Sequence, residues 1–182
     1  MSLPAFRYHP DPPATGSVIR SDARCVCCGD ACGYVYAGPV YAVDEYENCL
    51  CPWCIADGSA HARLGAAFTD TYGIGIGGGE WDEVPDAVVS EIACRTPGFQ
   101  GWQQERWWTH CGDAAQFVGR AGAGELRALG PQAVASIRES TGLDEGAEWE
   151  HFLAALDKDG SPTAYMFRCI RCGEPGGYQD CD

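Results

Sequence analysis

The sequence is poor in positive charge and has almost no lysine. Among 182 residues, 12 are Lys or Arg and 26 are Asp or Glu, so the formal net charge is -14, and Lys158 is the single lysine. A protein that binds nucleic acid needs a stripe of basic side chains to neutralise phosphates, and the same deficit would repel an anionic membrane surface. We therefore expect neither nucleic acid nor a membrane as a partner, which leaves another protein.

The sequence also has no long apolar run, and we do not expect its first residues to be a leader. No stretch approaches the roughly 18 apolar residues of a membrane span, and the N-terminus has no basic segment followed by an apolar one. We therefore expect a chain of the cytoplasm, which is a reducing compartment. Hydrophobic residues still make up 46% of the chain and aromatic residues 11%, which is enough apolar surface to form a core.

Cysteine, by contrast, is abundant, with 12 residues. In a reducing compartment this density points to metal binding or thiol chemistry rather than to structural disulfides. Zinc takes four tetrahedral ligands, and two cysteines separated by two residues in a tight turn aim both sulfurs at one point. Two such pairs occur, with 22 residues between Cys28 and Cys51, slightly more than the roughly 15 to 20 of zinc ribbons. They predict a zinc site formed by Cys25, Cys28, Cys51 and Cys54.

Two alternatives to this zinc site stay open. The four cysteines could be buried free thiols, which pack as small hydrophobic groups. The sequence Cys51-Pro52-Trp53-Cys54 also resembles the active-site motif of thioredoxin-like proteins, and a helix N-terminus would lower the pKa of the Cys51 thiol. A thioredoxin-like site needs a βαβ unit around the motif, however. The sequence upstream of Cys51 shows no such unit and contains a second Cys-x-x-Cys pair instead.

A second candidate site is built around Cys169 and Cys172. This pair has no Cys-x-x-Cys partner, and the best donors elsewhere are the adjacent His110 and Cys111. Neighbours on a regular strand point to opposite faces, so Cys111 is the firmer choice and Asp113 could replace either. We predict a second zinc site at His110, Cys111, Cys169 and Cys172, with packed core groups as the alternative.

The other histidines and cysteines carry no strong signal. We expect His9, His61 and His151 to be surface or helix-cap residues. The five remaining cysteines are expected to pack as small apolar groups, two of them beside the first site. They are Cys27, Cys32, Cys49, Cys94 and Cys181.

The organisation of the chain indicates an α+β protein stabilised by zinc, with treble-clef or zinc-ribbon-like elements, short β-hairpins and amphipathic helices. We expect an extended surface arm at 1–23, a four-cysteine zinc module at 24–72, and an α+β part at 73–182 that packs with the module as one unit. Gly73 to Gly79 is expected to be a loop without a phosphate-binding role.

The residue patterns also predict individual elements. Aromatic and β-branched residues around Gly38-Pro39 favour a hairpin over 33–42. Apolar spacing favours helices over 55–68, after Pro85, over 131–139 and over 145–156. Strands are expected on either side of a turn at 111–113 and over 163–168.

Several longer motifs give the chain a specific resemblance. They are Leu3–Tyr8, Cys51–Ala60, Arg95–Gln104, His110–Asp113 and Phe167–Gly173. With these motifs the chain resembles, over nearly its full length, the CbrC-like family of small bacterial proteins, which is linked mainly to colicin tolerance in enterobacteria. The resemblance implies that the predicted ligand cysteines belong to family motifs, with His110 beside them. It implies no reaction.

We therefore expect a zinc-binding protein that acts as a binding or stress-response module. Four thiolates close the zinc shell, whereas a catalytic zinc keeps one position for water. The alternative is an enzyme, either a thiol oxidoreductase at Cys51 and Cys54 or a zinc hydrolase at the second site. No catalytic residue and no organic cofactor site follow from the sequence.

Overall fold

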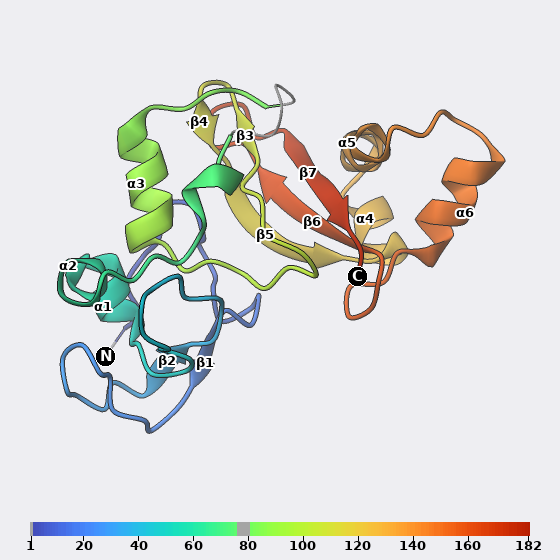
Figure 1. Cartoon of the computed structure of the whole chain (residues 1–182). Coiled ribbons are helices and arrows are strands. Elements are labelled where there is room, and N and C mark those ends of the chain that lie inside the picture. The colour runs from blue at the N-terminus through green and yellow to red at the C-terminus, as the bar shows by residue number, and fades with distance from the viewer. Residues whose placement is uncertain (1, 76–80) are drawn as a thin grey trace.

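The computed structural model describes residues 2–75 and 81–182. Most of the loop expected at 73–79 therefore lies outside the described residues. The described chain forms an N-terminal lobe, a central sheet and a helical end, which lie one after another in Figure 1. Three clusters of buried hydrophobic residues correspond to these parts. The expected α+β class, with short hairpins and helices, is confirmed.

The N-terminal lobe holds two short strands and two short helices. Strands β1 (Val18–Arg20) and β2 (Tyr34–Tyr36) pair antiparallel. Helices α1 (Pro52–Ala56) and α2 (Ser59–Leu64) follow. The helix expected over 55–68 is divided, because Gly58 takes a left-handed φ of 79° between the two helices.

The hairpin expected over 33–42 is wrong. Strand β2 pairs with β1 from the N-terminal arm, and Tyr41 makes only an isolated antiparallel bridge to Ala67. The hydroxyl of Tyr36 donates to the Pro39 carbonyl at 2.9 Å, so the chain after β2 turns over the Tyr36 ring instead of returning along the strand. Residues 18–20 of the arm supply the strand partner instead.

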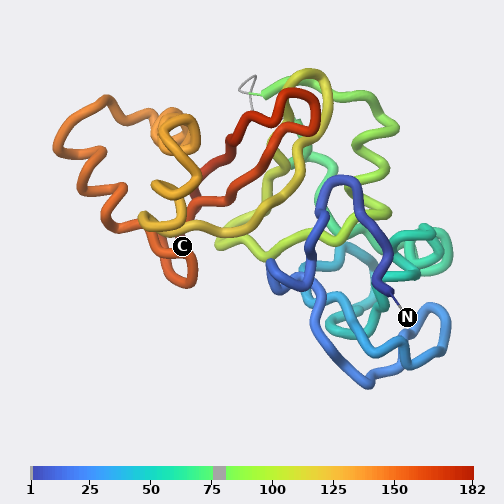
Figure 2. The backbone as a smooth tube through the Cα atoms, turned by 180° about the vertical axis from the view of Figure 1, so that it is seen from behind, coloured from blue at the N-terminus to red at the C-terminus, as the bar shows by residue number. Residues whose placement is uncertain are grey.

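The N-terminal arm is not the surface segment that its prolines suggest. Phe6, Tyr8 and His9 are buried, and the Tyr8 carbonyl accepts a hydrogen bond from the amide of Phe117 at 2.8 Å. Figure 2 shows the arm looping up from the N-terminal lobe to the sheet. The arm therefore fills part of the core between the lobe and the sheet.

The central sheet has three antiparallel strands in the order β5 (Gln116–Ala121), β6 (Thr163–Arg168) and β7 (Pro175–Asp180). The predicted strand over 163–168 is confirmed as β6. A small hairpin, β3 (Thr109–His110) with β4 (Asp113–Ala114), confirms the predicted turn. Strand β7 escaped prediction because its sequence, PGGYQD, has no run of β-formers.

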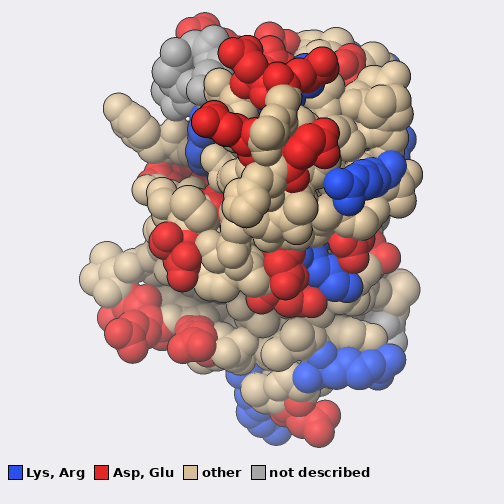
Figure 3. All heavy atoms as spheres, turned by 90° about the vertical axis from the view of Figure 1, so that its right-hand side faces the viewer, with Lys and Arg blue, Asp and Glu red and all other residues tan. Residues whose placement is uncertain are grey.

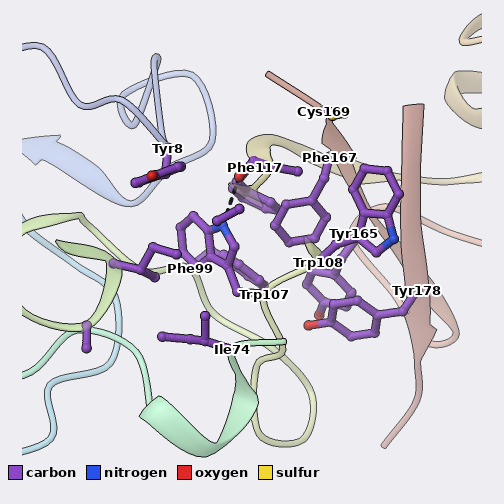
Figure 4. Packing of buried hydrophobic residues seen from close by; sticks show 14 residues of the cluster. Tyr8, Ile74, Phe99, Trp107, Trp108, Phe117, Tyr165, Phe167, Cys169 and Tyr178 are labelled. Carbon is purple, nitrogen blue, oxygen red and sulfur yellow. Dashed lines mark hydrogen bonds between the residues drawn. The ribbon is translucent and has the colours of Figure 1, made fainter. Parts of the chain in front are cut away.

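Aromatic side chains make up most of the core beside the sheet, as Figure 4 shows. Phe99 and Phe117 stack with ring centroids 3.9 Å apart. The indole of Trp107 is fully buried, and its N–H donates to the Ala115 carbonyl at 2.9 Å, so this core holds a polar group with a partner.

Four further helices lie beside the sheet. Helix α3 (Asp86–Arg95) follows the short turn η1 (Thr71–Gly73) and confirms the predicted helix after Pro85. Helices α4 (Ala123–Ala128), α5 (Pro131–Thr141) and α6 (Ala147–Ala155) form the helical end around Leu126, Ile137 and Trp149. The two helices predicted in this region are confirmed as α5 and α6. In the described residues, no helix is both long and apolar enough to cross a membrane.

Helix α5 covers the free edge of the sheet. The outward amides of Gly177 and Gln179 donate to the hydroxyls of Ser136 and Ser140, at 3.2 and 3.3 Å, and Pro175 has no amide hydrogen to offer. An open edge would invite pairing with another chain. The two serines, one helical turn apart, close this edge without adding a strand.

The serine contacts predict a measurable contribution to stability. Ser136→Ala and Ser140→Ala should each lower the free energy of unfolding by about 1 kcal/mol in denaturant titrations, because a strand amide loses its acceptor. Gln132→Ala serves as the control. Gln132 is an exposed residue of the same helix, so this change raises helix propensity, as the serine changes do, but removes no contact with the sheet edge. Serine variants as stable as this control would show that the edge contacts contribute nothing.

The burial of His9 predicts a pH dependence. Its Nδ1 lies 2.7 Å from the Pro97 carbonyl, which can only accept, so Nδ1 carries the proton and Nε2 accepts from Thr15. Burial is the main reason that the pKa of His9 falls to about 4. As the pH decreases below about 6.5, His9 binds a proton in the unfolded chain but not in the folded chain. The free energy of unfolding therefore decreases until the pH reaches about 4.

We expect the stability difference between the unchanged chain and His9→Gln to shrink by about 2 kcal/mol from pH 6.5 to about pH 5. Denaturant titrations at both pH values measure it. The exposed His151 supplies the control, since His151→Gln should leave the slope unchanged. A His9→Gln difference independent of pH would contradict the burial argument.

Candidate metal centres

Cys25, Cys28, Cys51 and Cys54 come together in the N-terminal lobe. Their four sulfurs all lie within 4.8 Å of one another. The Cys25 and Cys54 sulfurs are 3.9 Å apart, and those of Cys28 and Cys51 are 4.0 Å apart. Zinc–sulfur bonds of about 2.3 Å in a tetrahedron require sulfurs about 3.8 Å apart. The group therefore has the size of a tetrathiolate metal site.

Two local structures aim these sulfurs at one point. Residues 25–29 form a tight turn closed by a 2.7 Å hydrogen bond from the Gly29 amide to the Cys25 carbonyl. Cys51 stands at the N-terminus of α1 and Cys54 lies in its first turn. The Cys51 amide donates to the Cys25 sulfur at 3.3 Å, which joins the turn to the helix.

The electrostatics of this group suit a cation. Burial opposes ionisation of the Cys25 thiol, but backbone amides donating to its sulfur outweigh it and lower the pKa to about 7. Burial raises the pKa of Cys54 to about 12 and that of Cys51 further. A bound divalent cation would favour all four thiolates together.

The same facts bear on thioredoxin-like chemistry. A reactive redox cysteine is partly exposed and has a lowered pKa. The Cys51 thiol is 1% exposed and burial raises its pKa. The structure therefore gives this cysteine neither property.

The second group joins His110, Cys111, Cys169 and Cys172, whose ligand atoms also lie within 4.8 Å of one another. His110 Nδ1 is 3.4 Å from the Cys111 sulfur and 3.5 Å from the Cys172 sulfur. Tetrahedral zinc with one nitrogen and three sulfurs would place nitrogen and sulfur about 3.6 Å apart. This group also has the dimensions of a metal site.

The turn between β3 and β4 brings the adjacent His110 and Cys111 to one side. Neighbours on a strand would point apart, but Cys111 has a φ of 57° and Gly112 a φ of 67°, so the chain leaves the strand geometry at Cys111. Cys169 and Cys172 lie in the turn that connects β6 to β7, which a 3.0 Å bond from the Gly173 amide to the Cys169 carbonyl closes.

The His110 ring is held from two sides. It stacks on Trp108, with ring centroids 5.1 Å apart and planes 11° apart, and its Nε2 lies 3.9 Å from a Glu174 oxygen. Gly176 makes room for this indole, because a Cβ there would lie 2.3 Å from the Trp108 ring. A carboxylate near the second nitrogen of a ligating histidine is a common outer contact of metal sites. Sequence reasoning missed Trp108 and Glu174.

The thiols of the second group differ in acidity. Burial raises the pKa of Cys169, but the amides of Cys172 and Arg171 and the contact with His110 outweigh it and lower the pKa to about 6. Desolvation and the neighbouring thiols of Cys172 and Cys169 raise the pKa of Cys111 to about 11. A cation at the centre of the group would offset the repulsion between neighbouring thiolates, and so would favour ionisation of all three thiols.

Asp113 lies outside both groups. Its carboxylate is 2% exposed and accepts hydrogen bonds from Arg7 at 2.8 Å, from the Tyr8 hydroxyl at 2.9 Å and from Arg171 Nε at 3.2 Å. Arg171 stands between the ligand candidates Cys169 and Cys172. Asp113 therefore connects the N-terminal arm to the second cysteine turn. Of the two residues that the sequence offered beside the three cysteines, His110 lies in the group and Asp113 does not.

The remaining cysteines and histidines lie outside the two groups of four. All twelve cysteines are free thiols. Cys27 and Cys32 pack in the N-terminal hydrophobic cluster, and Cys94 packs beside the aromatic core. Of the three other histidines, His61 and His151 are exposed as expected, whereas His9 is buried.

A cavity of about 460 Å³ adjoins the second group. His110, Trp108 and Glu174 line one wall, and Ser136 and Glu139 of α5 line another. The second group is therefore more open to solvent than the first. Cys111 and Cys172 are both exposed, whereas only Cys28 is exposed in the first group.

Comparisons with known proteins place the chain among bacterial relatives. A family model described as "Uncharacterised protein family (UPF0167)" matches residues 3–181. UPF0167 proteins of Mycobacterium bovis and Mycobacterium tuberculosis are each 49% identical over 183 residues, covering 98% of this chain and 93% of theirs. One from Pseudomonas aeruginosa is 44% identical over 173 residues, covering 94% and 93%. No solved structure matches the chain.

The Asp113 contacts predict a stability effect. Asp113→Asn removes the charge that holds two arginines and should lower the free energy of unfolding by about 2 kcal/mol, because hydrogen bonds to charged groups contribute more than neutral ones. Denaturant titration measures this loss, and faster tryptic cleavage after Arg7 should report the loosened arm.

The exposed pair of Arg120 and Asp159, 3.9 Å apart, provides the matched control. Asp159→Asn should change stability by no more than a few tenths of a kcal/mol. Equal effects of the two variants would mean that the Asp113 contacts add nothing beyond an ordinary surface pair.

Proposed function

Because the chain belongs to the UPF0167 family, whose description names no reaction, we propose its function from the two candidate metal centres. We propose that it is a zinc-binding protein in which two zinc ions stabilise the fold, and that it acts as a binding or stress-response module rather than as an enzyme.

The proposal depends on one observation: two groups of four donors each have the dimensions of a zinc tetrahedron. Four cysteines, or three cysteines with one histidine, are donor sets typical of structural zinc. Thiolate ligands disfavour magnesium and calcium, which prefer oxygen. Four protein donors leave no position for a water, so these sets support a structural rather than a catalytic role.

At the first centre we propose a treble-clef-like arrangement. The turn at Cys25 and Cys28 supplies one pair of ligands, and the N-terminus of α1 supplies the other. Zinc would thereby join two segments that share little regular structure. At the second centre, zinc would join the β3–β4 turn to the β6–β7 turn, and so hold the small hairpin against the sheet.

Two enzyme alternatives have weaker support. A thiol oxidoreductase at Cys51 and Cys54 conflicts with the burial of Cys51 and its raised pKa. A zinc hydrolase at the second centre gains some support from the adjoining cavity and from Glu174 near His110. That chemistry needs a ligand position for water, however, and the second group already supplies four donors.

The biological setting is also part of the proposal. The resemblance to CbrC-like proteins favours a stress-response role related to colicin tolerance, and free thiols fit the cytoplasm. Figure 3 shows Asp and Glu side chains spread over one face, with Lys and Arg only in separate patches. Together with the net charge of -14, this favours another protein over nucleic acid or a membrane as the partner.

Metal analysis of protein purified without added zinc tests the proposal. We expect two zinc ions per chain, and chelation should unfold residues 24–68, because zinc binding energies of about 10 kcal/mol or more are comparable to the whole stability of a domain. Hydrogen exchange followed by mass spectrometry should locate the unfolding.

Single substitutions assign the two ions. Cys54→Ser should lose the first zinc and His110→Ala the second, whereas Cys94→Ser, which changes a half-buried cysteine outside both groups, should keep both. Alkylation of Cys51 as fast as an exposed thiol, in a metal-free chain, would favour the oxidoreductase. A chain that is fully folded without metal would overturn the proposal.

A further inference from the structure

We propose that Cys28 and Cys32 form a site of oxidative modification, at which a hydroperoxide joins the two sulfurs in a disulfide and expels the metal of the first centre. This inference rests on the proposed function, because it assumes that Cys28 binds zinc. It adds a regulated state to a centre that would otherwise be only structural.

The first centre has one corner open to solvent. Cys25, Cys51 and Cys54 are buried, whereas Cys28 is exposed. A small oxidant from solution therefore reaches Cys28 first. Cysteine oxidation follows thiolate character and exposure, and a zinc-bound cysteine is a thiolate.

A spare thiol lies beside this open corner. Cys32 is half-buried, packs against the hydrophobic cluster that surrounds the ligands, and interacts with the thiols of Cys28 and Cys51. Its sulfur also contacts the carbonyl of Asp30, the residue that follows the ligand turn, at 3.8 Å. The three residues between the two cysteines are exposed, so a short solvent-facing segment separates the two sulfurs along the chain.

The other spare thiols of the lobe are less well placed. Cys27 is 2% exposed, and its sulfur contacts the Ser59 hydroxyl at 3.6 Å, on the side of α2. The half-buried Cys49 interacts with the buried Cys25 rather than with the exposed corner. The Cys51 sulfur is 4.0 Å from that of Cys28, but Cys51 would itself be bound to the metal. Cys32 alone combines a free thiol with a place next to Cys28.

The reaction needs only a hydroperoxide as oxidant. The Cys28 thiolate attacks the peroxide oxygen, the O–O bond breaks, and a sulfenic acid and hydroxide form. The Cys32 thiol then attacks the Cys28 sulfur, the S–O bond breaks, and a disulfide and water form. Two electrons pass from the two sulfurs to the peroxide. The metal is left with three thiolates, and a thiol reductant reverses the disulfide.

Hydrogen peroxide added to the zinc-loaded full chain tests this inference. A chromophoric chelator should record zinc release, and peptide mapping should find Cys28 joined to Cys32. Cys32→Ser should keep two zinc ions before oxidation, because Cys32 lies outside the ligand group. It should then release the first zinc several-fold more slowly and leave Cys28 as a sulfinic acid that a thiol reductant does not restore.

Cys27→Ser and Cys49→Ser are the matched controls, because each removes a spare thiol of the same lobe away from the exposed corner, and both should behave as the unchanged chain. Equal release from Cys32→Ser, or peptides joining Cys28 to Cys51, would overturn the inference while leaving the zinc proposal intact. A chain purified without zinc would instead contradict the proposed function.

Discussion

The convergence of sulfur atoms from separate turns is the constraint on which the N-terminal lobe depends. Its helices have only five and six residues, and its two strands have three each. Helices of that length are not stable in water without tertiary contacts. The cysteine turn at 25–29 and the start of α1 meet at one point, and the hydrophobic cluster of the lobe forms around that point.

In the second group, ligand atoms from two separate turns also meet at one point, here beside the aromatic core. This group is connected to the rest of the chain in a different way. Asp113 holds Arg171, which stands within the second cysteine turn, and also holds the arm through Arg7 and Tyr8. The arm in turn pairs with β2 through β1 and so belongs to the N-terminal lobe. A continuous chain of contacts thus connects the surroundings of the two groups, although the groups lie in different hydrophobic clusters.

How far the sequence reveals the structure depends on the range of the contacts. The pairing within Cys25–Cys28 and Cys169–Cys172 is local, so the spacing alone predicts it. The helices near 131 and 145 show periodic apolar residues, and the strand 163–168 is a short run rich in apolar and aromatic residues, so these elements were also predictable. The arm was not, because the carboxylate that holds it lies far away in the sequence and its strand partner follows only after the cysteine turn at 25–29. Glu174 was missed for the same reason, because only folding places it beside His110. Trp108 lies two residues before His110, and side chains at that spacing in an extended chain share a face, so this contact did have a local signal.

The β7 margin of the three-stranded sheet is occupied by the molecule itself, and so is the β5 margin at Phe117. Serine hydroxyls of α5 take the outward amides of β7, and the Tyr8 carbonyl takes the amide of Phe117 on β5. The backbone along β7, and at Phe117 on β5, therefore has little left to offer to a foreign strand. A binding partner that meets the β7 edge would have to recognise this protein through the shape and chemistry of its side chains, so that specificity is open to change by single substitutions without disturbing the sheet.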